Sequence, residues 1–157
     1  MNTIEIDTTD LNPTQKPEEK EQLPELKVFV DGSCSPNPGG TMTGGVYIEY
    51  QGRKLWDATK VYLGNTGTNN MAEICIAIYG LQVLKRIQEK YPEYNVPSVM
   101  FSDSLLTVNS IQNGRAKSPA LDDKVDEFLK IRDSMQHKPK VVWHKREENS
   151  RADARSR

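Results

Sequence analysis

Short apolar runs bounded by turn-forming residues predict where the strands lie. The run at residues 28–30 indicates a buried strand. Residues 46–50 and 54–63 flank Gln51-Gly52, a pair typical of a hairpin turn. Two later runs have the same apolar character, at residues 99–101 and 141–143. The pattern therefore predicts a sheet of about five strands.

A second period, with apolar residues three or four positions apart, predicts the helices. It is clearest over residues 71–88, and residues 105–111 and 121–135 also show it. Asn113-Gly114 is a good C-terminal stop for the middle helix. Three strands, a helix, a strand, two helices and a strand predict a mixed α/β sheet flanked by helices, with a short C-terminal tail.

The first 26 residues differ from the rest in composition. They carry seven acidic residues and two lysines, a charge of −5, and no sustained apolar period. We predict a disordered acidic tail over residues 1–26 and a single domain over residues 27–157. That domain has 19 basic and 15 acidic residues, a charge of +4, which favours a polyanionic partner.

Several classes of protein are disfavoured. The longest apolar run is too short to span a membrane, and no secretory signal is visible at the N-terminus. The two cysteines, Cys34 and Cys75, form neither a metal-type spacing nor a disulfide framework. We therefore expect a cytoplasmic protein without a membrane partner, and a monomer.

Acidic residues stand at the ends of several predicted elements. Asp31 follows the strand at 28–30, Asp103 follows the strand at 99–101, and Glu73 opens the first helix. Asp153, near the C-terminus, makes a fourth. An unpaired buried charge is very costly, so such carboxylates must be solvated, hydrogen-bonded or bound to a cation.

The spacing of these carboxylates restricts the type of site. They are 42, 30 and 50 residues apart, whereas the ligands of a local calcium loop lie within about 12 residues. Oxygen ligands without clustered His or Cys favour magnesium or manganese over zinc. Two such ions about 4 Å apart can activate water and stabilise a leaving oxygen during phosphodiester cleavage.

Four segments carry a family resemblance. DGSCSPNPGG at 31–40, TNNMAE at 68–73, FSDS at 101–104 and HKREENSRAD at 144–153 resemble, in order, the signature blocks of type 1 ribonuclease H. The match covers residues 27–157. It implies a ribonuclease H-like fold and endonucleolytic cleavage of the RNA strand of RNA–DNA hybrids, with two Mg²⁺ ions that Mn²⁺ can replace.

The resemblance also assigns residues. It makes four carboxylates the metal-binding and catalytic set: Asp31, Glu73, Asp103 and Asp153. Asp31 would bridge both ions, and Glu73 would touch the ion near the scissile phosphate and help order the ribose 2′-hydroxyl. Contacts to the hybrid would come from five further residues: Ser33, Cys34, Asn37, Asn69 and Asn70. None of these contacts reads base identity, so we expect little sequence preference.

The C-terminal part departs from the pattern of many family members. His144 stands where they carry a mobile loop with a histidine that assists proton transfer or product release, but here no glycine follows it. It is either a catalytic participant or the exposed last residue of a strand. Only residues 154–157 follow Asp153, whereas the family commonly continues into a helix.

Each motif also has a simpler interpretation. Asp31 can be a turn residue, Glu73 a first-turn acid stabilised by the helix N-terminus, and Asp103-Ser104 an N-cap pair. The glycines of TMTGG at 41–45 are expected first in tight turns, and Trp56 and Trp143 are expected in the core or on a hairpin face. The four motifs together favour a nuclease that acts on RNA–DNA hybrids to remove RNA primers or R-loops. The alternatives are a non-catalytic module that binds hybrid or double-stranded RNA, and a metal nuclease for another polynucleotide.

Overall fold

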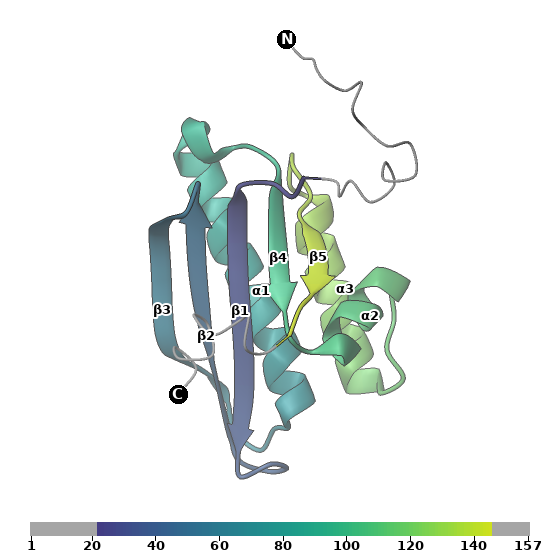
Figure 1. Ribbon diagram of the computed structural model, residues 1–157. Coiled ribbons are helices and arrows are strands. Elements are labelled where there is room, and N and C mark those ends of the chain that lie inside the picture. The colour runs from purple at the N-terminus through teal and green to yellow at the C-terminus, as the bar shows by residue number, and fades with distance from the viewer. Residues whose placement is uncertain (1–21, 146–157) are drawn as a thin grey trace, which may run out of the picture.

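The computed structural model describes residues 22–145, and over this range the chain forms a five-stranded mixed sheet (Figure 1). The strands are β1 (Leu26–Ser35), β2 (Thr41–Tyr50), β3 (Arg53–Gly64), β4 (Ser98–Ser102) and β5 (Lys140–Trp143). Their order across the sheet is β3-β2-β1-β4-β5. The central strand β1 is antiparallel to β2 and parallel to β4, so it joins two differently built halves.

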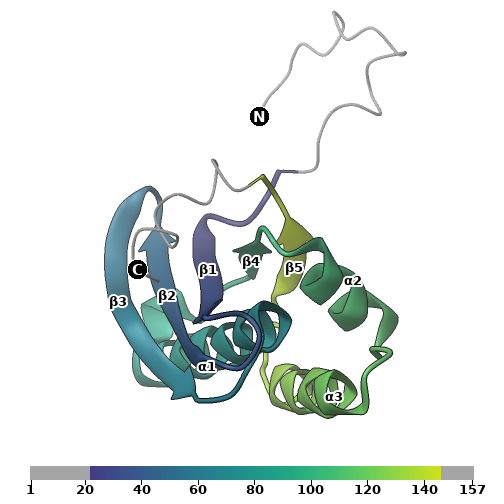
Figure 2. The ribbon, with the colours of Figure 1, turned by 90° about the horizontal axis from the view of Figure 1, so that it is seen from below.

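Helices cover one side of this sheet. Those in the described range are α1 (Asn69–Lys90), α2 (Leu105–Asn113) and α3 (Pro119–Asp133), with a 3₁₀ turn η3 (Pro92–Tyr94) before β4. Helices α1 and α3 lie side by side beneath the same face of the sheet, and α2 packs beside β5 (Figure 2). The predicted order of elements and the mixed sheet are confirmed.

Local sequence accounts for the ends of the helices. Each α-helix begins after a hydroxyl residue whose side chain accepts an N–H of the first turn: Thr68, Ser104 and Ser118. Helix α2 ends at Asn113 and is capped by Gly114, whose φ of 81° is easily reached only without a side chain. These signals position α1 and α2 immediately after the loops that bear the predicted site residues.

The length of β1 corrects the sequence interpretation. The apolar pattern ends the strand before Asp31, whereas β1 continues to Ser35. Backbone pairing with β2 runs on through Asp31 opposite Gly45 to Ser35 opposite Thr41. Backbone N–H and C=O groups need partners whether or not the side chains are apolar, so the ladder extends past the hydrophobic run.

The glycines of β2 are a second correction. The sequence assigns Gly44 and Gly45 to a tight turn, but both lie inside the strand. A Cβ on Gly44 would stand 2.6 Å from Cγ1 of Ile76 in α1, so this glycine lets the helix pack on the sheet. Glycine here serves close packing rather than chain reversal.

The two faces of β1 have different roles. Val28 and Val30 are fully buried and belong to the main core, which they share with Leu81 of α1. Phe29 belongs to a separate cluster and stacks on Phe101, with the ring centroids 5.1 Å apart. Because alternate residues of a strand face opposite sides, Asp31 shares the face of Phe29 and not that of the core.

Helix α1 approaches β1 most closely at Gly32. A Cβ on this residue would lie 2.5 Å from the carbonyl oxygen of Ala72, which is closer than any relaxed contact. The contact joins backbone to backbone, so no side-chain movement can relieve it. Gly32 therefore fixes the distance between the strand that bears Asp31 and the helix that bears Glu73.

Neither cysteine is in a disulfide. Burial raises the pKa of the Cys75 thiol, as expected for a small residue packed on a helix. Within residues 22–145, no helix is long and apolar enough to cross a membrane. Most of the predicted acidic segment 1–26 lies outside the described residues.

Gly32→Ala should destabilise the fold by about 1–3 kcal/mol, because α1 must move away from β1 to admit the methyl group. Denaturant unfolding followed by circular dichroism measures this change. Gly80→Ala is the matched control: its Cβ would meet side-chain methyl groups and no backbone, the nearest being Cγ1 of Val30 at 3.0 Å, and alanine gains about 1 kcal/mol of helix propensity. Equal losses in both variants would contradict the argument.

Candidate active site

Asp31 lies in the interior of the sheet. It belongs to the central strand β1 and is only 1% exposed. Its partner across the antiparallel ladder is Gly45 of β2, which has no side chain to fill the space beside the carboxylate. A larger residue at position 45 would place its side chain on the same face of the sheet as Asp31. The backbone thus leaves room for a ligand next to a deeply placed charge.

Asp103 reaches the same place from the neighbouring strand. β4 is parallel to β1, and Val30 pairs with Ser102, the last residue of β4. Asp103 follows Ser102 as Asp31 follows Val30, so the two carboxylates stand at corresponding positions of neighbouring parallel segments. Ser104 then caps α2 by accepting the N–H of Thr107 at 3.2 Å. The chain therefore turns from strand to helix at the residue that carries the carboxylate.

Glu73 comes from the helix side. It lies in α1 beyond the first turn, which contains no acidic residue, so it is not the first-turn acid of the simpler interpretation. Its side chain is 7% exposed, and its Oε1 accepts the backbone N–H of Gly32 at 3.1 Å. The close approach of α1 at Gly32 makes this bond possible and orients the carboxylate towards β1.

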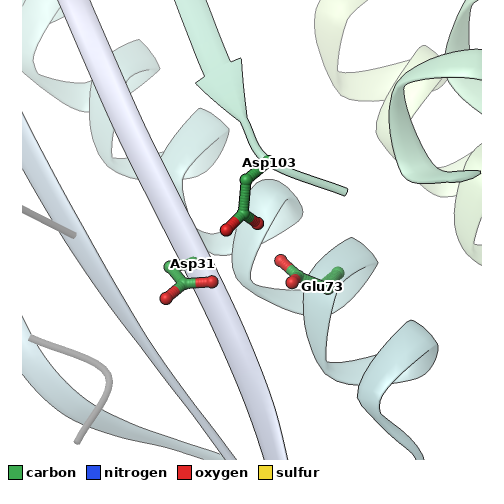
Figure 3. A group of neighbouring side chains, drawn as sticks. All are labelled: Asp31, Glu73 and Asp103. Atoms are coloured by element: carbon green, nitrogen blue, oxygen red, sulfur yellow. The ribbon is translucent and has the colours of Figure 1, made fainter. Parts of the chain in front are cut away.

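The three carboxylates converge. One oxygen from each of Asp31, Glu73 and Asp103 lies within 4.8 Å of the others, as Figure 3 shows for side chains from β1, α1 and the end of β4. Negative charges this close repel one another, and a cation offsets that repulsion. Oxygen donors of this kind suit hard divalent ions. The cluster can therefore hold a metal ion.

The predicted substrate residues form a second, connected group beside the cluster. Asn37 Oδ1 accepts the N–H of Asn69 at 3.0 Å, and Asn69 Oδ1 accepts the N–H of Cys34 at 2.8 Å. Backbone bonds from Gly39 and Gly67 join the same two loops. The loop after β1 and the loop before α1 are thus held together before any ligand binds.

The remaining residues of that group differ in accessibility. Asn70 is exposed at the start of α1, and Ser33 is half-buried on the same face of β1 as Asp31. The side chain of Cys34 is buried, with its Sγ 3.3 Å from the carbonyl of Pro36. Since the N–H of Cys34 also bonds within the protein, Asn37, Asn69 and Asn70 present the most accessible polar groups.

His144 lies near the carboxylates but outside their cluster. It follows β5, and its backbone N–H donates to the carbonyl of Ser102 at 3.1 Å. Its half-buried ring has its centroid 4.8 Å from that of Phe101 and 5.9 Å from that of Phe29. Both phenylalanines precede a carboxylate of the site by two positions. Asp153 lies outside the described residues.

The family model for RNase H matches residues 24–155 of this sequence. The chain belongs to the RNase H family. This places it among the ribonuclease H hydrolases and confirms the resemblance seen in the four motifs. The matched range contains the three converging carboxylates, Asp153 and the loops around Asn37 and Asn69.

Two curated ribonucleases H are similar to this RNase H chain. One, from Desulforamulus reducens, is 35% identical over 95 residues, which cover 60% of this chain and 52% of that protein. The other, from Cereibacter sphaeroides, is 27% identical over 150 residues, which cover 86% of this chain and 94% of that protein. The chain thus matches about half the length of the former and nearly all of the latter.

Solved structures agree with the fold. LC11-RNase H1, isolated from compost by a metagenomic approach, has a TM-score of 0.72 and 28% identity, and the match covers 84% of this chain and 92% of that one. The same protein in complex with an RNA/DNA hybrid has a TM-score of 0.72 and 29% identity, with 83% and 92% covered. The mixed sheet is therefore that of the RNase H family.

Sequence reasoning missed two contributors to the site. Gly45 was assigned to a turn, although a glycine inside a strand pattern is itself a signal for close approach. The sequence predicts a core or hairpin-face position for Trp143, but its Nε1 donates to the carbonyl of Asp103 at 3.1 Å. No sequence signal identifies the bond from Trp143 to Asp103, since it depends on the pairing of β4 with β5.

Mg²⁺ should stabilise the wild type, and Asp31→Asn should abolish that stabilisation while leaving the metal-free protein as stable or about 1 kcal/mol more stable. The amide keeps the shape of the carboxylate and removes one of three repelling charges. Thermal unfolding with and without Mg²⁺ measures both effects. Asp123→Asn on the exposed surface of α3 is the control and should behave as wild type.

Proposed function

We propose that this protein is an endonuclease that hydrolyses the RNA strand of RNA–DNA hybrids with little sequence specificity. The observation that carries the proposal is the convergence of Asp31, Glu73 and Asp103 within 4.8 Å on the sheet of an RNase H family member. The hybrid complex of the similar LC11-RNase H1 supports the choice of substrate.

The proposed metal centre uses four carboxylates and two Mg²⁺ ions, which Mn²⁺ can replace. Asp31 would lie between the ions, Asp103 and Asp153 would each help to hold one, and Glu73 would lie near the scissile phosphate. Bound ions of this kind activate water and neutralise charge on the leaving oxygen. The bond from Gly32 to Glu73 Oε1 supports this arrangement, because it fixes the direction of one ligand in advance.

The amide groups of the loops support minor-groove recognition. Asn37 and Asn69 each use the side-chain oxygen as an acceptor inside the protein, so their N–H groups are the atoms presented to a ligand. The minor groove offers acceptors at every base pair and the 2′-hydroxyl of each ribonucleotide. Donors that bond to acceptors common to all base pairs do not read sequence. A bond to the 2′-hydroxyl is what distinguishes a ribonucleotide from a deoxyribonucleotide.

A catalytic role for His144 remains a prediction. Its ring packs on Phe101 and Phe29, which favours the strand-end interpretation, yet both neighbours lie two residues before a proposed metal ligand. We also propose that the protein acts as a monomer in the cytoplasm, with the acidic segment predicted over residues 1–26 preceding the catalytic domain predicted over 27–157. The boundary falls one residue earlier than the sequence predicts, because Leu26 is buried and opens β1. Free cysteines are compatible with a reducing compartment.

Asp31→Asn should reduce cleavage of the RNA strand by at least about a hundredfold, because even groups that only support metal ligands are worth 10- to 100-fold. A labelled RNA–DNA hybrid with Mg²⁺ gives the rate, and Asp153→Asn in the same assay tests the fourth ligand. Asp123→Asn should retain full activity. Hybrid binding by a folded wild type without cleavage in Mg²⁺ or Mn²⁺ would point instead to a non-catalytic binding module.

Asn69→Asp should raise the KM for hybrid about tenfold or more and leave kcat nearly unchanged. The carboxylate keeps the oxygen that accepts from Cys34, but it lacks the N–H donors and adds a charge that repels phosphate. Asn95→Asp, which precedes the opposite end of β4, adds the same charge away from the site and should leave KM unaltered. Steady-state cleavage kinetics would separate the two, and a loss confined to kcat would refute donor recognition.

A further inference from the structure

The indole of Trp143 contacts the backbone of a proposed metal ligand. Trp143 is the last residue of β5 and pairs with Ser102, the last residue of β4. Beyond this pair, the indole Nε1 donates to the carbonyl oxygen of Asp103 at 3.1 Å. A side chain thus extends the hydrogen bonding between the two strands by one residue, to the position that carries the carboxylate.

Asp103 occupies a junction between two well-fixed elements. On one side, Ser102 is buried and its carbonyl accepts the N–H of His144 at 3.1 Å. On the other, Ser104 caps α2 and its own N–H donates to Ser102 Oγ at 3.1 Å. The carbonyl of Asp103 and the N–H of Ser104 belong to one planar peptide group, and rotation of that group would swing the carboxylate relative to Asp31 and Glu73.

Core packing alone does not explain the presence of a tryptophan at position 143. It is 42% exposed, whereas Trp56, the other tryptophan, packs against the main core and lies 6.4 Å from the ring of Tyr79. An exposed tryptophan gives up part of the benefit of burial, so its polar N–H contact is the more specific feature. That contact reaches the ligand-bearing residue directly.

We propose that Trp143 is a positioning residue, whose indole N–H holds the carbonyl of Asp103 so that the carboxylate is directed into the metal cluster. This inference rests on the proposed function, because it concerns how one ligand of the proposed centre is held. Ligands must be kept within about 0.5 Å of their productive positions by groups behind them. Loss of the bond should therefore weaken metal binding and leave hybrid binding intact.

The test removes the N–H without changing the shape of the ring. Trp56→Phe leaves Trp143 as the sole tryptophan of the chain, so 3-benzothienylalanine supplied in place of tryptophan replaces only this indole, with sulfur where the N–H was. Trp56→Phe with ordinary tryptophan is the matched control. Trp143→Phe provides a second variant, in which the N–H and part of the ring are both lost.

Two readouts separate positioning from general damage. Calorimetric titration with Mn²⁺, which needs no catalysis, should show metal affinity about tenfold weaker without the indole N–H. In the cleavage assay, the half-saturating Mg²⁺ concentration should rise by a similar factor, while saturating Mg²⁺ restores kcat to within about twofold and KM for hybrid stays constant.

The outcomes distinguish this inference from the proposed function. If the control binds metal and cleaves hybrid while the benzothiophene variant matches it in metal affinity, the positioning role is wrong and the nuclease assignment stands. If the control itself neither binds metal nor cleaves, the proposed function fails and this inference fails with it. A loss of kcat that saturating metal does not restore would also overturn the positioning role.

Discussion

The close approach of α1 to β1 at Gly32 is the constraint on which the site depends. Backbone meets backbone there, so the helix sits at a distance that no larger residue allows. From that position Glu73 reaches over to accept the N–H of Gly32, and its carboxylate enters the space beside Asp31. The parallel pairing of β1 with β4 supplies Asp103 to the same space. A helix set further out would leave two carboxylates without the third.

Bringing these charges together opposes folding and serves chemistry. Three carboxylates within 4.8 Å repel one another in the absence of a cation, and two of them are more than 90% buried. The fold accommodates this because the ligands are attached to different rigid elements, each stabilised elsewhere by the core or by helix caps. Such a site gains stability when it binds metal, which links metal affinity to the stability of the whole domain.

The loops beside the cluster show the same preorganisation in neutral groups. Asn37 and Asn69 use their oxygens to hold two loops together, and under the proposed function this leaves their N–H donors for the ligand. Rigid donors lose little entropy on binding, so recognition of a groove does not require the loops to reorganise. On β5, the proposed positioning residue Trp143 contacts the backbone of Asp103. The carboxylates are thus flanked by supports from both halves of the sheet.

The sequence by itself determined the order of elements and the identity of the acidic residues, because apolar period, caps and turn residues are local properties. It ended β1 before Asp31 and placed Gly44 and Gly45 in a turn, since hydrophobic runs do not report how far a backbone ladder extends. Only the tertiary structure decided the bond from Gly32 to Glu73, the space opposite Asp31 at Gly45, and the contact of Trp143 with Asp103. Each of these joins segments distant in the chain, and their distances follow from sheet register and helix packing, which no single segment encodes.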